Sequence, residues 1–111
     1  MAQITYDDFT KVDIRVGTIL EAAPLEGARK PAFRLSIDFG PEIGIKRSSA
    51  QITHYPREQL EGSLIVGVVN LTPRVIARFK SEVLVLGALD DAEGVVLLRP
   101  DKAAAVGSRI A

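Results

Sequence analysis

The chain has 111 residues, a length that allows one hydrophobic core but not two. Its 14 lysines and arginines balance its 14 aspartates and glutamates, so net charge predicts no attraction to nucleic acid or to an anionic membrane. Cysteine is absent, which excludes disulfides, thiolate nucleophiles and cysteine-ligated metals. No apolar run of about 18 residues and no signal-peptide pattern is found, so we expect residues 1–111 to form one soluble, cytoplasmic domain without membrane insertion.

A short helix is predicted over residues 7–12. Asp7 is placed to cap its first turn, and Phe9 and Val12, at positions i and i+3, form one apolar edge. This edge is expected to pack on the domain or on a partner.

Alternating polarity predicts a first strand over residues 13–22, in which Gly17 indicates a bulge or a bend. The side chains expected on one side of this strand are Ile14, Val16, Thr18 and Leu20. Residues 24–31 are bounded by prolines and are expected to form a loop with Arg29 and Lys30 at its tip.

The clearest half-buried strand covers residues 32–39, where alternation has no exception. Its apolar side chains are Phe33, Leu35, Ile37 and Phe39. A third strand is expected over residues 43–50, unless a bulge at Gly44 changes the alternation. Ile43 and Ile45 are predicted to point inward, and Lys46 and Ser48 outward. Residues 56–62 begin with proline and end with glycine, which predicts one or two helical turns.

Two apolar runs, residues 64–69 and 83–86, predict a fourth and a fifth strand, both buried. The connection between them breaks at residues 70–73 and then carries the cations Arg74, Arg78 and Lys80. We interpret this connection as a rigid support for positive charge, although Asn70 and Pro73 are also ordinary turn residues. Residues 29–80 as a whole contain nine basic and four acidic residues, so an anion-facing surface is expected there.

After an acidic turn at residues 90–94, residues 95–98 predict another short strand, and a turn is expected at residues 107–108. Five strands with a short helix between the third and fourth match the all-β OB-fold barrel, here with N- and C-terminal extensions. A small β-sandwich is the alternative architecture. The apolar faces of residues 95–98 and of the first helix need cover, which either a second copy or the same barrel could supply.

No catalytic, metal or cofactor site is expected. His54 has no triad pattern and no metal-ligand spacing around it, and no glycine-rich phosphate loop occurs. Binding chemistry is better represented, because residues 45–51 gather two cations, two hydroxyls and an amide suited to phosphate contacts or to an extended peptide. Phe79, between two cations, is either a stacking surface or a core anchor.

Several separated motifs resemble the tRNA-binding domain found at the ends of some methionyl- and phenylalanyl-tRNA synthetases. These are residues 13–19, 38–40, 68–74 and 80–82. Residues 43–53 and 79–87, together with the length, are most similar to the CsaA-type protein-secretion chaperones. This resemblance implies a dimeric OB-fold protein that assists export by binding preproteins and retains tRNA binding. The tRNA-domain surface then corresponds to Lys46, Arg47, Ser48, Ser49, Asn70, Arg74, Lys80 and Ser81.

The leading hypothesis is a non-enzymatic export chaperone, a homodimer that binds unfolded preproteins or extended peptides in an apolar groove. The cations expected at its rim are Arg29, Lys30, Arg74, Arg78 and Lys80. The secretion motor is considered as a further partner. The alternative is a tRNA-binding protein that uses the same basic surface. A small hydrolase or metalloenzyme is the least supported reading.

Overall fold

The computed structural model describes all 111 residues and contains nine strands and two short helices. Five strands form the main antiparallel sheet, in the order β3-β2-β1-β4-β7. They are β1 (Ile14–Pro24), β2 (Phe33–Asp38), β3 (Ile45–Ala50), β4 (Leu64–Val68) and β7 (Leu84–Val85). The sheet curls until its edges meet, where Glu82 N donates to Arg47 O over 2.8 Å and Ser48 Oγ donates to Val83 O over 2.8 Å. The predicted five-stranded OB-type barrel is confirmed.

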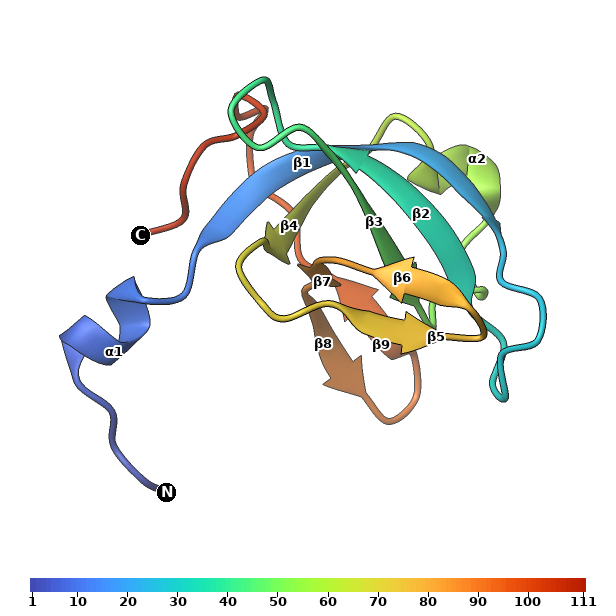
Figure 1. Cartoon of the computed structure of the whole chain (residues 1–111), viewed down its shortest axis with the longest axis horizontal. Helices are drawn as coiled ribbons and strands as arrows, with labels where there is room; N and C mark the ends of the chain where they lie inside the picture. Colours follow the sequence, from blue (N-terminus) through green and yellow to red (C-terminus); the bar gives the residue numbers. More distant parts are fainter.

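Two hairpins extend this barrel (Figure 1). In the first, β5 (Arg74–Ile76) pairs with β6 (Phe79–Ser81), and β6 contacts β3 at the closure of the barrel. In the second, β8 (Gly87–Asp90) pairs with β9 (Gly94–Leu97). Only the last of these strands was predicted, and residues 70–82 were interpreted as a rigid, cation-bearing connection without strands of its own.

The two helices are short. Helix α2 (Arg57–Leu60) lies between β3 and β4 as predicted, with Leu60 fully buried and Gly62, at φ +86°, just past its end. Helix α1 (Tyr6–Thr10) begins earlier than predicted, because Thr5 rather than Asp7 is the N-cap. Thr5 Oγ1 accepts from the backbone N–H of Asp8, and the Asp8 carboxylate accepts from Thr5 N in return. Neither helix has the length and apolar character needed to cross a lipid bilayer.

Helix α1 stands away from the barrel, and the chain ends lie on its side of the molecule (Figure 1). Asn70 holds the segment between α1 and β1, since its Oδ1 accepts from Asp13 N over 2.9 Å and its Nδ2 donates to Lys11 O over 2.7 Å. Arg109 Nη2 also donates to Thr10 O over 2.8 Å. The Asn70 side chain therefore positions residues 1–13, the N-terminal arm that contains α1.

The core lies between the curled sheet and α2. Its most buried members include Ile19, Leu35, Ile37, Phe39, Ile52, Leu60 and Ile65. Gly17 was predicted to mark a bulge or a bend, and the register of β1 and β2 shifts between Ile19 and Glu21 rather than at Gly17. Gly17 instead leaves room for the core, because a Cβ there would lie 2.7 Å from Ile37 Cγ2 and 2.8 Å from the Phe39 ring.

Three side chains, in two strands, have the opposite orientation to that predicted. Leu20 is 47% exposed while Ile19 is fully buried, because the register shift makes the alternation of β1 irregular. In β3, Ile45 is 62% exposed and Ser48 is fully buried, the reverse of the prediction. Gly44 at φ +86° reverses the chain before β3 and moves the alternation by one position.

The C-terminal tail runs beside the first half of β1, where Val16 N donates to Ser108 O over 2.9 Å. Arg15 fastens this junction. Its Nε donates to Asp13 Oδ1 over 2.6 Å, and its Nη1 donates to Gly107 O over 3.0 Å. The hydrogen bond from Arg15 lowers the pKa of the Asp13 carboxyl, and partial burial opposes that change.

This ion pair predicts a component of acid unfolding. A carboxyl with a lowered pKa in the folded protein adds stability that is complete above its unfolded pKa of about 3.9 and is lost as the pH falls through the folded value. We therefore expect Asp13→Asn to flatten the stability profile below about pH 4, measured by circular dichroism during acid titration. Asp7→Asn, in an exposed side chain without an ion pair, is the control. If the wild type, Asp13→Asn and Asp7→Asn lose stability in the same way as the pH falls, the ion pair does not have this role.

Candidate binding groove

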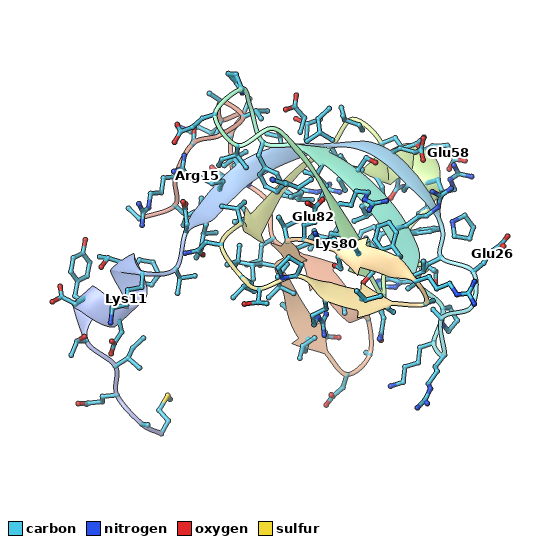
Figure 2. The ribbon with its side chains drawn as sticks, viewed as in Figure 1. Lys11, Arg15, Glu26, Glu58, Lys80 and Glu82 are labelled. Carbon is cyan, nitrogen blue, oxygen red and sulfur yellow. The ribbon has the colours of Figure 1, made fainter.

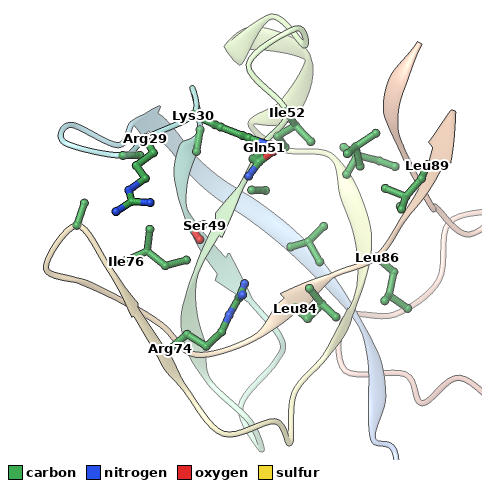
Figure 3. Close-up of a pocket in the computed structure, with 18 of the residues that line it drawn as sticks. Arg29, Lys30, Ser49, Gln51, Ile52, Arg74, Ile76, Leu84, Leu86 and Leu89 are labelled. Atoms are coloured by element: carbon green, nitrogen blue, oxygen red, sulfur yellow. The ribbon is translucent and has the colours of Figure 1, made fainter. Parts of the chain in front are cut away.

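A groove of about 810 Å³ opens beside the β5–β6 hairpin, where the end of β3 separates from β7 (Figure 3). Most of its lining is apolar. The apolar residues include Ala50 and Ile52 after β3, Val75 and Ile76 of β5, Leu84 of β7 and Leu89 of β8. Two polar side chains, those of Ser49 and Gln51, also reach it. Since strands β3, β5, β7, β8 and β9 and the loop between β1 and β2 all contribute, the groove exists only in the folded barrel.

Three cations belong to this groove. Arg29 and Lys30 come from the loop between β1 and β2, and Arg74 comes from the start of β5. In Figure 3 Arg29 and Lys30 lie along one rim and Arg74 lies at the other end. No aspartate or glutamate lines the groove, and none of the three cations forms a salt bridge. Their positive charge is therefore not neutralised within the protein and is available to a bound ligand.

Four of the predicted site residues meet in this groove, namely Arg29, Lys30, Ser49 and Arg74. The other seven, which do not line it, are Lys46, Arg47, Ser48, Asn70, Arg78, Lys80 and Ser81. The predicted set therefore occupies more than one surface of the molecule.

Two of those seven side chains join the edges of the barrel. Ser48 is fully buried and donates to Val83 O, and Ser81 Oγ, in a residue 6% exposed, accepts from Ser49 N over 3.0 Å. Ser48 therefore has no surface to offer a ligand. Both hydroxyls thus make hydrogen bonds between β3 and the segment Ser81–Val83, which closes the barrel.

The remaining cations lie outside the groove. The Arg47 guanidinium sits 5.0 Å from the centre of the Phe79 ring, within range of a cation–π contact. Lys80 is exposed on β6 near Glu82 (Figure 2), on the face opposite to that of its buried neighbours Phe79 and Ser81. Arg78 occupies the hairpin turn at φ +65°.

Phe79 is a core anchor rather than a stacking surface. It is 9% exposed and packs with Leu25 and Ala32 in a second small apolar cluster. Ile76 of β5 joins this cluster, which fixes the hairpin against the loop that carries Arg29. The cluster therefore sets the distance between the loop that carries Arg29 and Lys30 and the strand that carries Arg74.

His54 has a structural contact with the second hairpin. Its Nε2 lies 3.0 Å from Val95 O, and the neighbouring Tyr55 hydroxyl accepts from Leu97 N over 3.1 Å. Together these side chains hold β9 against the segment that follows β3. No group of three or more histidine, aspartate or glutamate side chains is placed to hold a metal ion.

The burial of Ser48 gives a prediction that separates structure from binding. Ser48→Ala leaves Val83 O without its donor, which we expect to lower the free energy of unfolding by about 1–3 kcal/mol. The measurement is urea denaturation followed by circular dichroism. Affinity for a groove ligand should stay unchanged in the folded variant. If the variant is folded as completely as the wild type but binds less tightly, Ser48 takes part in binding. Ser36→Ala, on the partly exposed face of β2, is the matched control.

The barrel and its groove define a small OB-type binding domain. Residues 14–109 match the family described as "Putative tRNA binding domain", and the chain belongs to this family. It is 36% identical over 110 residues to the methionine–tRNA ligase of Methanosarcina acetivorans, and 39% identical over 112 residues to that of Nitrosomonas eutropha. The matches cover 99% and 96% of this chain but only 15% of either ligase.

Three solved structures match the chain along essentially their whole length. The CsaA chaperone protein of Picrophilus torridus is 52% identical with a TM-score of 0.94, and the alignment covers 98% of this chain and 100% of that one. The chaperone CsaA of Bacillus anthracis is 50% identical with a TM-score of 0.92, covering 99% and 100%. A methionyl-tRNA-synthetase-related protein of Pyrococcus horikoshii is 27% identical with a TM-score of 0.86, covering 99% of both chains. The resemblance read from the sequence motifs is confirmed.

Proposed function

We propose that this protein is a non-enzymatic export chaperone that holds unfolded preproteins or extended peptides in the groove. The observation that carries the proposal is an apolar groove rimmed by Arg29, Lys30 and Arg74, with no carboxylate in its lining. Apolar side chains of an unfolded segment would be removed from water there, and acidic side chains would meet the free cations. The whole-length similarity to proteins named as CsaA chaperones supports the same role.

A second candidate function is tRNA binding. The family match over residues 14–109 and the similarity to methionine–tRNA ligases favour it. The groove cations would then contact phosphates, with Arg47 and Lys80 on a neighbouring surface as further contacts. With few aromatic residues and Phe79 buried, base stacking would contribute little, so recognition would depend on the shape and backbone of the RNA.

We further propose that the protein works in the cytoplasm as a homodimer, with the secretion motor as a further partner. Apolar side chains remain exposed on the N-terminal arm and on the second hairpin. They include Ile4, Tyr6 and Val12, with Val96 of β9 and Leu98 just after it. A second copy could cover such a surface through a two-fold contact. Light scattering should give twice the 12.0 kDa chain mass, and a mass of one chain would remove the dimer from the proposal.

Titration at two salt concentrations tests the chaperone proposal against the tRNA alternative. We expect an unfolded preprotein to bind with a moderate dependence on salt, because apolar contacts carry part of its affinity. Binding of tRNA should weaken steeply with salt, because each phosphate contact releases a counterion. Fluorescence anisotropy with labelled ligands measures both. If tRNA binds far more tightly than any polypeptide at physiological salt, the chaperone proposal is replaced by the alternative.

A further inference from the structure

Strand β5 has a free edge at the groove. It pairs with β6 on one side and has no strand on the other. All of β5, together with Ala77, lines the groove. Native proteins usually protect such an edge with a lysine, a proline or a covering segment. Here the middle residue of the strand is Val75, an apolar side chain that is 73% exposed.

The geometry of the hairpin shows which backbone groups point to the free edge. Ala77 and Arg78, at φ +49° and +65°, form a two-residue turn with two left-handed residues. In such a hairpin the pair that closes the turn, Ile76 and Phe79, exchanges both of its hydrogen bonds, and bonded pairs recur at every second residue. The N–H and C=O of Val75 therefore point away from β6, and neither has a partner in the fold.

From this edge, the apolar lining and the free cations, we propose that the groove binds its guest by strand addition. The guest is an extended polypeptide segment that pairs with β5 through the N–H and C=O of Val75. Successive side chains of a strand point to opposite sides, so apolar residues would contact the lining while the acidic residues between them meet Arg29, Lys30 and Arg74. This inference rests on the proposed polypeptide-binding function. It adds the sequence pattern of the bound segment, alternating apolar and acidic residues, and its backbone pairing with β5.

The first test replaces the edge donor. Val75→Pro removes the outward N–H, and its ring obstructs the edge, while proline is tolerated where the N–H does not serve the existing ladder. Val75→Ala is the matched control, because it shortens the side chain and keeps the N–H. The probe is a labelled peptide of about eight alternating valine and glutamate residues, a common strand length. We expect Val75→Pro to weaken binding about tenfold or more relative to Val75→Ala, since hydrogen bonds and close approach are both lost.

The second test keeps the protein unchanged, so it holds even if the proline variant misfolds. Two versions of the probe carry N-methyl groups on alternate amides, in one phase or in the other. Only one set of amides faces β5, so one version should bind weakly and the other close to normally. Equal effects of both versions, or equal affinities of Val75→Pro and Val75→Ala, would overturn strand addition. Failure of the wild-type protein to bind any acidic, apolar peptide would instead reject the proposed function itself.

Discussion

Phe39→Ala is expected to lower the free energy of unfolding by about 3–5 kcal/mol, the usual cost of emptying a buried aromatic site. Phe39 is fully buried directly after β2, and its ring lies over Gly17 of β1 and Gly67 of β4. A Cβ at Gly67 would lie 3.2 Å from Phe39 Cζ, and one at Gly17 would be closer still. A loss of this size is a large share of the stability of a small domain, and urea denaturation would measure it.

The same contact allows a double-mutant test. Gly17→Val alone should destabilise the barrel by about 1–3 kcal/mol, because the added carbons overlap the Phe39 ring and Ile37. In Phe39→Ala the overlap with the ring is removed and only the contact with Ile37 remains, so the two substitutions together should cost less than the sum of the single costs. Ile45→Ala, at a side chain 62% exposed, should change stability by less than about 0.5 kcal/mol and serves as the control. Additive costs would mean that the ring does not rest on Gly17.

Removal of the three groove cations is expected to have the largest effect on binding. Replacing Arg29, Lys30 and Arg74 together by alanine should lower the affinity for an acidic, apolar peptide by up to about a hundredfold at low salt. The loss should be much smaller at high salt. For tRNA the same variant should reduce the slope of affinity against salt by about two units on logarithmic axes. Titrations over a range of salt concentrations would measure both changes.

A matched triple variant controls for the loss of net charge. Arg34, Arg99 and Lys102 are exposed, form no salt bridge and do not line the groove. Replacing these three by alanine removes the same charge and should leave peptide affinity nearly unchanged. If both triple variants weaken the peptide equally, overall charge rather than the groove determines binding. If only the variant lacking Arg34, Arg99 and Lys102 binds tRNA less tightly, the RNA site lies outside the groove.

Part of the structure was predictable because its signal is local. Residues 32–39 alternate without exception, and Phe33, Leu35, Ile37 and Phe39 are all buried as expected. The helix before β4 was predicted from its flanking proline and glycine. The β5–β6 hairpin was missed because its turn is Ala77–Arg78, two residues that seldom adopt left-handed conformations and so carry no turn signal.

The sequence by itself determined the order of the main strands, the OB-type barrel and the family, because alternation, turn residues and spaced motifs all lie along the chain. It also pointed to Arg29, Lys30, Ser49 and Arg74, but within a larger set that included the buried Ser48 and the outward Lys80. Only the tertiary structure decided which of these residues share a groove. The physical reason is that sheet closure, the reversal at Gly44 and the pairing of β5 with β6 set the direction of each side chain, and all three depend on residues far apart in the sequence.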